Sequence, residues 1–186
     1  MNVISGMKDE LPQGLYTGLG AYRHEVFVKM LGWDLATPMG CEQDQFDRPD
    51  TVYVLSRDDE QSITGCARLL PTTRPYLLSE VFPQLLNGLP PPCSEDVWEL
   101  SRFAAVDVKG AAAPARSQLS SPIAVEILRE SIRAAAAFGA KRLITVSPIG
   151  IERLLRHANF RAHRAGPPMV IGGHPLFASW IEIEST

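Results

Sequence analysis

The sequence predicts an α/β fold in which helices pack on the faces of one largely antiparallel sheet. Segments rich in β-forming residues alternate with amphipathic segments, in the order helix, strand pair, strand, helix, strand, helix, strand. The composition agrees, since 45% hydrophobic and 21% charged residues are typical of a globular chain. A chain of 186 residues is long enough for a full core, so we expect a single domain over residues 1–186.

The first half of the chain is predicted to hold a long helix and a hairpin. Residues 15–31 place apolar side chains at helical spacing, and Gly32 is a typical end signal. The periodicity then disappears over residues 32–50, a stretch long enough to suggest a functional loop. Residues 51–56 and 63–70 are rich in β-formers and flank a short polar turn, which predicts a β-hairpin.

The second half is predicted to add three strands, a helix over residues 122–138 and a short basic helix. Ser121 and Pro122 form a good start signal for the first of these helices, and Gly139 is a good end signal. The predicted elements are a strand at 97–106, a helix at 122–138, a strand at 142–147, a helix at 150–158 and a strand at 175–184.

Charge and cysteine usage exclude several classes of protein. A net charge of −3 gives no general attraction to nucleic acid or to an anionic membrane. No apolar run approaches membrane-spanning length, and residues 1–14 lack the apolar stretch of a secretory signal. Cys41, Cys66 and Cys93 are odd in number and widely spaced, which predicts neither a disulfide framework nor a zinc site. We therefore expect a cytoplasmic protein with reduced thiols, no nucleic-acid partner and no membrane span.

Positive charge is concentrated in residues 129–164, which hold eight Lys or Arg residues and two Glu residues. Such a segment is either a solvated helical face or a docking surface for an acidic partner. The sequence leaves both interpretations open.

Ionisable side chains in an otherwise apolar strand mark a candidate site. The run VWELSRFA at 97–104 contains Glu99 and Arg102, and ionised groups are costly to bury unless they are paired or used. Strict alternation puts these two on opposite faces, so both could serve one site only if a β-bulge lies between them. Ser101 and Phe103 share the face of Glu99. Apolar surroundings are expected to raise the pKa of Glu99, which is either a general base or a structural carboxylate paired with an arginine.

A second group of acids lies in the loop at 32–50. Asp44 and Asp47 could receive a cationic group, anchor arginines or simply form a turn; a lone D-x-x-D is a weak metal signal, and no metal site is predicted. Three arginines match three acids in number, which favours a partly buried ion network. The arginines are Arg23, Arg68 and Arg102, and the acids are Asp44, Asp47 and Glu99.

With these residues the chain resembles the acyl-homoserine lactone synthases, the autoinducer synthases of bacterial quorum sensing. The resemblance rests on the runs YRHEVFV (22–28), GWD (32–34), EQDQFD (42–47), GCARLLPTTRPY (65–76) and VWELSRFA (97–104). It extends over about residues 22–180, and the combination is specific although each run alone is weak. The invariant positions of the family correspond to Arg23, Phe27, Trp33, Asp44, Asp47, Arg68, Glu99 and Arg102.

The resemblance implies a three-layer α/β/α sandwich related to the N-acyltransferases. It implies S-adenosylmethionine as a substrate, no cofactor, and an acyl chain delivered by acyl carrier protein or, less often, by coenzyme A. The methionyl amine would attack the acyl thioester to form an amide. The methionyl carboxylate would then close on its own γ-carbon and expel methylthioadenosine.

The resemblance also implies roles for particular residues. Glu99 would take the proton of the ammonium group, directly or through a water, and Arg102 and Asp47 are the other expected catalytic residues. Thr145 matches a position associated with 3-oxoacyl chains, and Arg153, with its neighbour Arg156, matches a position implicated in carrier docking. The expected substrate-binding residues are Arg23, Phe27, Trp33, Asp44, Arg68, Ser101, Phe103 and Thr145.

Two other functions compete with this interpretation. A coenzyme A-dependent N-acetyltransferase of related fold would carry an R/Q-x-x-G-x-G/A loop before the helix at 122–138, and residues 110–120 lack that pattern. A non-catalytic module that recruits an acidic carrier protein would leave Glu99, Asp44 and their neighbours unexplained. The sequence therefore favours the synthase.

Overall fold

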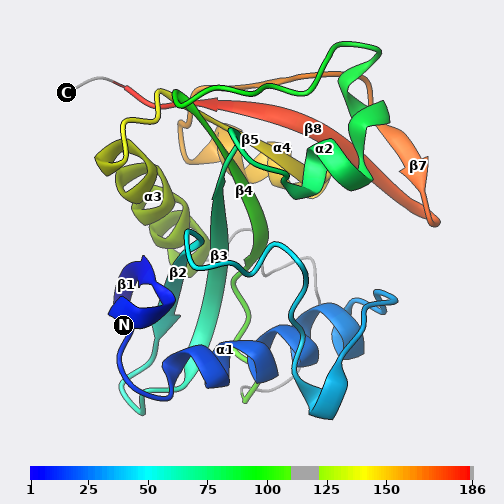
Figure 1. Ribbon diagram of the computed structural model, residues 1–186. Helices are drawn as coiled ribbons and strands as arrows, with labels where there is room; N and C mark the ends of the chain where they lie inside the picture. Colours follow the sequence, from blue (N-terminus) through cyan, green and yellow to red (C-terminus); the bar gives the residue numbers. More distant parts are fainter. Residues whose placement is uncertain (110–121, 185–186) are drawn as a thin grey trace. The chain divides into compact units, whose positions relative to one another are not determined.

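The computed structural model describes residues 1–109 and 122–184, and the chain divides into two compact units. The first unit comprises Met1–Arg68 and Arg102–Ser131, and the second comprises Leu69–Ser101 and Ile132–Thr186. Strands β3 (Ile63–Pro71) and β4 (Val97–Ala104) contribute residues to both units (Figure 1). The expectation of one domain over residues 1–186 stays a prediction.

The first unit contains strands in the order β1-β2-β3-β4. Its other elements are β1 (Asn2–Met7), η1 (Lys8–Glu10), α1 (Leu15–Arg23), η2 (His24–Met30), η3 (Pro38–Gly40), β2 (Val52–Arg57) and the first part of α3 (Pro122–Ala137). The hairpin of β2 and β3 was predicted, but β1 was not. Strand β1 runs antiparallel to β2, with Ile4 opposite Leu55, and this long-range pairing leaves little trace in a six-residue sequence.

Different helices cover the two faces of the strands in this unit. Tyr53 and Leu55 of β2 and Cys66 of β3 belong to the apolar core that α1 and η2 complete. The neighbouring Gly65 faces the other way, because a Cβ atom built there would lie 2.2 Å from the Cδ1 atom of Ile127 in α3. The unit is therefore layered as helix, sheet and helix, and Gly65 permits the close approach of α3.

The long helix predicted over residues 15–31 is not a single α-helix. The α-helix ends at Arg23, and residues His24–Met30 continue as a π-helix in which the Leu31 N–H donates to the Val26 carbonyl, five residues back. Apolar residues spaced by four along the sequence fit either helix, so the pattern did not separate them. Such π-helical turns occur often at functional sites.

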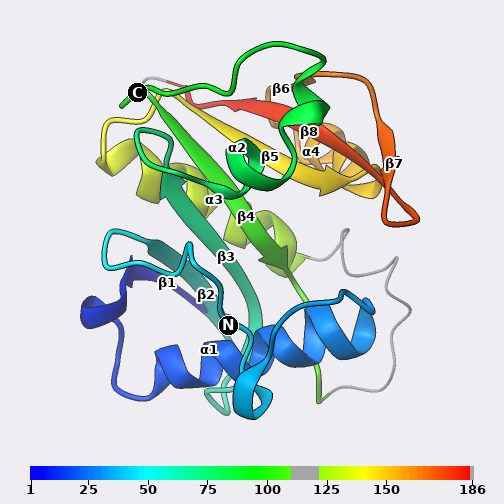
Figure 2. The same ribbon diagram turned by 45° about the vertical axis from the view of Figure 1, so that its right-hand side comes forward.

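The second unit contains the remaining strands in the order β4-β5-β8-β6, with β7 paired to β8. Its other elements are α2 (Leu77–Val81), η4 (Pro83–Leu86), the rest of α3, β5 (Arg142–Pro148), α4 (Gly150–His157), β6 (Ala162–Arg164), β7 (Met169–Ile171) and β8 (His174–Glu182). Strand β5 is parallel to β4 and antiparallel to β8, which runs beside it (Figure 2). The short strands β6 and β7 were not predicted.

Helices also lie on both faces of the second unit. Trp98 of β4 stacks on Phe138, just past α3, with ring centroids 5.1 Å apart. Its neighbour Glu99 points to the opposite face and binds the start of α2. The predicted Ser121 cap and most of the loop expected at 107–120 lie outside the described residues.

Candidate active site

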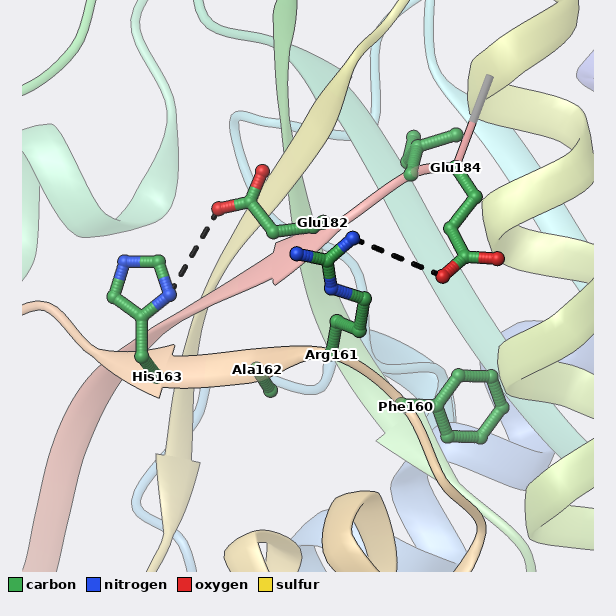
Figure 3. Close-up of a pocket in the computed structure, with 7 residues that line it drawn as sticks. Phe160, Arg161, Ala162, His163, Glu182 and Glu184 are labelled. Atoms are coloured by element: carbon green, nitrogen blue, oxygen red, sulfur yellow. Dashed lines mark ion pairs between the residues drawn. The ribbon is translucent and has the colours of Figure 1, made fainter. Parts of the chain in front are cut away.

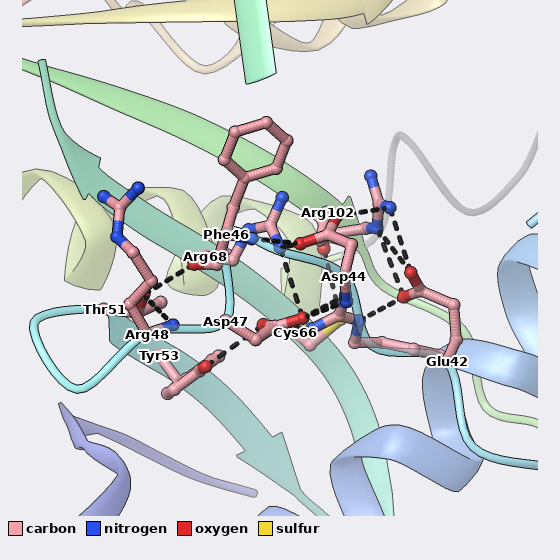
Figure 4. A network of polar contacts seen from close by, with 11 residues as sticks. Glu42, Asp44, Phe46, Asp47, Arg48, Thr51, Tyr53, Cys66, Arg68 and Arg102 are labelled. Carbon is pink, nitrogen blue, oxygen red and sulfur yellow. Dashed lines mark hydrogen bonds and ion pairs between the residues drawn. The ribbon is translucent and has the colours of Figure 1, made fainter. Parts of the chain in front are cut away.

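Six ionised side chains in the first unit form a closed ring of alternating charge (Figure 4). The ring runs in the order Arg23, Glu42, Arg102, Asp44, Arg68 and Asp47 and back to Arg23. Each guanidinium group contacts two carboxylates, and each carboxylate is shared by two guanidinium groups. Buried charges are tolerated when every one is paired and hydrogen-bonded, and a closed ring meets this condition for all six.

Arg23 and Asp47 form a deeply buried pair of the ring, with side chains 2% and 3% exposed. Nη1 and Nη2 of Arg23 donate to the two oxygens of Asp47 at 2.8 and 3.1 Å, and its Nε donates to Glu42. Asp47 also accepts hydrogen bonds from the Tyr53 hydroxyl and the Asp44 N–H. Burial is the largest single effect and raises the pKa of Asp47, but the charges of Arg23 and Arg68, together with the hydrogen bonds from Arg23 and the Asp44 N–H, outweigh it and hold that pKa well below its usual range.

Arg68 closes the ring from strand β3, where its side chain is 1% exposed. Its Nη1 donates to Asp44 at 2.6 Å and lies 3.4 Å from an Asp47 oxygen. Its guanidinium carbon lies 5.6 Å from the centroid of the Phe46 ring, within the range of a cation–π contact. Asp44 and Asp47 therefore anchor arginines, which is one of the roles that the sequence left open for them.

Strand β4 continues through Arg102, whose φ angle of 51° makes a local break in the extended backbone. The pairing of β4 with β5 ends at Leu100, and the left-handed φ angle of Arg102 departs from the extended backbone on which strict alternation along residues 97–104 depends. The β-bulge that the sequence would require if Glu99 and Arg102 served one site stays a prediction. Nε and Nη2 of Arg102 both donate to Glu42, and Nη2 also donates to Asp44 at 2.9 Å.

Glu42 is the ring member that the sequence analysis missed. Its side chain is 1% exposed, and it bridges Arg23 and Arg102. Burial is the largest single effect and raises the pKa of Glu42, but the hydrogen bonds and charges of Arg102 and Arg23 together outweigh it and lower that pKa. The sequence did contain a clue to Glu42, because it begins the run EQDQFD, which also contains the predicted site residues Asp44 and Asp47.

An aromatic pair lies beside the ring. Phe27 of η2 is buried and stacks on half-buried Trp33, with ring centroids 4.9 Å apart. The guanidinium carbon of Arg102 lies 5.8 and 6.0 Å from the two ring centroids. The first unit therefore brings together seven of the predicted residues, namely Arg23, Phe27, Trp33, Asp44, Asp47, Arg68 and Arg102.

Glu99 lies in the second unit, where it is fully buried on β4. Its two carboxylate oxygens accept hydrogen bonds from the N–H groups of Leu77 at 3.0 Å and Leu78 at 2.6 Å, at the start of α2. The apolar surroundings expected from sequence therefore include two backbone donors.

Thr145 of β5 lies on the opposite face of the sheet from Glu99. In the parallel register Glu99 pairs with Ile144 and Leu100 pairs with Thr145, and paired residues share a face. The Thr145 hydroxyl is buried, 3.1 Å from the hydroxyl of Ser147. The structure therefore does not bring Thr145 to the face of Glu99. Two other predicted residues lie on β4, buried Ser101 and half-buried Phe103.

Arg153 and Arg156 project into solvent from α4, one helical turn apart. The buried side of the same helix carries Ile151, Leu154 and Leu155. Glu152 forms a bidentate pair with Arg164 of β6, at 2.7 Å for both hydrogen bonds. The charge of Glu152 is thus engaged, whereas Arg153 and Arg156 stay exposed.

A separate concave surface of the second unit lies along β6 and the end of β8 (Figure 3). Arg161 lies 3.9 Å from Glu184, and His163 lies 3.8 Å from Glu182. None of the predicted site residues lines it. Within residues 1–109 and 122–184, no three His, Cys, Asp or Glu side chains are grouped as metal ligands. No helix in the same ranges is long and apolar enough to cross a membrane.

Comparison with known proteins gives consistent matches over nearly the whole chain. An acyl-homoserine-lactone synthase of Acinetobacter nosocomialis is 56% identical over 98% of this chain and all of its own length. The crystal structure of TofI in a ternary complex with an inhibitor and MTA is 44% identical, with a TM-score of 0.84 over 99% of this chain and 92% of TofI. The structure of BjaI, a CoA-dependent acyl-homoserine lactone synthase with SAM and isopentyl-CoA, is 25% identical, with a TM-score of 0.83 over 98% of this chain and 82% of BjaI.

The same comparison confirms the predicted fold class. An N-acetyltransferase structure from Lactobacillus plantarum, only 12% identical, has a TM-score of 0.63 over 98% of both chains and shows that the fold is shared. The sheet is mixed and largely antiparallel, as predicted. The family model for autoinducer synthases matches residues 13–186. This chain therefore belongs to the autoinducer synthase family and is an acyltransferase of that family.

Proposed function

We propose that this protein makes an N-acyl-L-homoserine lactone from S-adenosylmethionine and an acyl thioester, and releases methylthioadenosine. The observation that carries the proposal is the hydrogen bonding of the Arg102 guanidinium group. Its Nε and Nη2 are held by the ring, while Nη1 has no hydrogen-bond partner among the described residues. A guanidinium fixed in this way, beside the Phe27–Trp33 stack, suits a substrate that carries both a carboxylate and a cationic sulfonium.

The proposed chemistry assigns one role to each group. Arg102 binds the methionyl carboxylate, and Trp33 packs against the adenosyl or sulfonium part. Glu99 takes the proton of the ammonium group, directly or through a water, so that the amine can attack the thioester, form the amide and release the free thiol of the acyl carrier. Backbone N–H groups near the break at Arg102 bind the oxyanion. Lactone closure is intramolecular and has a sulfonium as its leaving group, so it needs little beyond geometry.

The remaining ring residues act by holding Arg102 in place. Arg23, Arg68, Asp44 and Asp47 complete the ring in which Arg102 is fixed. A catalytic role for Asp47 and direct substrate contacts by Ser101, Phe103 and Thr145 stay predictions. S-adenosylmethionine is a substrate in this scheme, and the scheme requires no cofactor.

The purified protein is expected to convert S-adenosylmethionine and an acyl thioester to a lactone and methylthioadenosine in equal amounts. Mass spectrometry of organic extracts detects the lactone, and the thioether product is measured in the aqueous phase. A panel of acyl chains, with and without a 3-oxo group, reports the substrate preference. Folded protein that yields an acylated product from a different amine, with no lactone, would contradict the proposal and favour an N-acetyltransferase.

We propose acyl carrier protein as the acyl donor, because α4 presents exposed Arg153 and Arg156 and carrier proteins are acidic. Arg153→Glu is expected to raise the KM for the acyl carrier protein about tenfold or more and to leave the KM for S-adenosylmethionine unchanged. The effect should shrink at high salt, since exposed charges are screened. Lys8→Glu, the same change at an exposed lysine of the first unit, is the control. Equal or faster turnover of acyl-coenzyme A by the unmodified protein, with no effect of Arg153→Glu, would identify coenzyme A as the donor.

A further inference from the structure

Glu42 is the ring member whose contacts define the plane of the Arg102 guanidinium group (Figure 4). Its two oxygens accept from Nε at 3.2 and 3.3 Å and from Nη2 at 2.9 Å, which is a side-on, two-point contact. Asp44 contacts Nη2 alone, at 2.9 Å. A planar guanidinium held at two nitrogens by one carboxylate has a fixed orientation, whereas a contact at one nitrogen leaves it free to turn.

We propose that Glu42 is a positioning residue that aims Nη1 of Arg102 at the carboxylate of the amino-acid substrate. The inference rests on the proposed function, in which that substrate is S-adenosylmethionine. Glu42 acts through Arg102, since its side chain is 1% exposed and both of its oxygens are occupied by guanidinium groups.

Loss of Glu42 opens the ring and is expected to lower the stability, as loss of Asp47 does, but both arginines that Glu42 bridges keep one other carboxylate. Without Glu42, Arg23 keeps its two hydrogen bonds to Asp47, and Arg102 keeps its bond to Asp44. The chain is therefore expected to fold, with Arg102 present but free to turn. What disappears is the direction of Nη1, which only the substrate carboxylate would sense.

The loss of charge and the loss of orientation predict opposite changes in the affinity of Glu42→Gln for a carboxylate ligand. Removal of one negative charge leaves the ring with a net positive charge, which by itself would strengthen the binding of a carboxylate. Loss of orientation would weaken the same binding. The direction of the change in affinity therefore separates the two explanations.

The experiment measures binding of two ligands that differ only in the carboxylate, S-adenosylmethionine and decarboxylated S-adenosylmethionine, by titration calorimetry. Glu42→Gln is expected to weaken S-adenosylmethionine about tenfold and to change the Kd of the decarboxylated ligand by less than twofold. Glu42→Asp keeps the charge but shortens the side chain, so it should show the same selective loss even if the Gln variant folds poorly. Glu25→Gln, the same change in the exposed Glu25–Lys29 pair, is the control and should affect neither ligand.

Four outcomes are informative. Equal weakening of both ligands, no change for either, or tighter binding of S-adenosylmethionine by Glu42→Gln would each overturn the positioning role. If the unmodified protein binds neither ligand, the proposed function itself fails, which is a result distinct from the other three. Thermal unfolding of each variant confirms that the comparison is made on folded protein.

Discussion

Glu99→Gln is expected to lower kcat for lactone formation by about a hundredfold or more, because an amide cannot accept the proton of the ammonium group. The change preserves size, and the Gln carbonyl oxygen can still accept a hydrogen bond from the start of α2. The fold should therefore survive, and carrier binding should be unaffected. Steady-state rates, with a thermal unfolding curve for each protein, test the expectation.

The control for this variant is Glu80→Gln, a neighbouring acid on α2 that is largely exposed. It should keep the unmodified rate. If Glu99→Gln retains most of its activity, Glu99 serves only to cap α2, and the proton must be taken by another group. If activity falls only in proportion to the loss of folded protein, the same structural conclusion follows.

Asp47→Asn is expected to destabilise the folded protein by about 3–5 kcal/mol, the range found when one partner of a buried charge pair is removed. Asp47 is shared by two arginines, Arg23 and Arg68, and both would face a neutral amide. Urea unfolding at pH 7 measures the loss. Asp50→Asn is the matched control, since Asp50 pairs with Arg48 at a site that is about one quarter exposed, and it should cost less than about 1 kcal/mol.

The dependence on pH gives a second test of Asp47. Its pKa is held below the usual range in the folded protein, because the charges and hydrogen bonds of its partners, chiefly Arg23, together outweigh the effect of burial. A carboxylate with a lowered folded-state pKa contributes stability above about pH 4, its unfolded-state pKa, and loses it as the pH falls. The difference in stability between the unmodified protein and Asp47→Asn should therefore shrink steadily between pH 5 and the acid limit of folding, both bounds being approximate. A difference that stays constant over this range would mean that the ionised form of Asp47 is not what stabilises the fold.

Much of the framework was predictable from local sequence. The hairpin at β2 and β3, the charged strand β4, and helices α3 and α4 each contain enough residues at one period to be recognised. The family runs also named seven residues that the first unit brings together. Such features were accessible because they depend on residue type and short spacing alone.

Other features depended on contacts between distant segments. Strand β1 pairs with β2, about fifty residues later, and the apolar period does not mark the change from α-helix to π-helix after Arg23. The face of Thr145 was set by its register with Leu100 across two strands. The alternation of side chains shows which residues of one strand share a face of the sheet. It does not show which residues of a neighbouring strand lie on that same face, because this depends on the register between the strands.

The sequence by itself determined the fold class, the family and the presence of an ion network around three arginines. Only the tertiary structure decided that Glu42 is a member of that network, because its partner Arg102 is sixty residues away and is turned toward it by a break in β4. The physical reason is that a buried charge must find its counter-charge within a few ångströms. Which acid satisfies each arginine is therefore fixed by distances in the folded chain and not by the number of acids in the sequence.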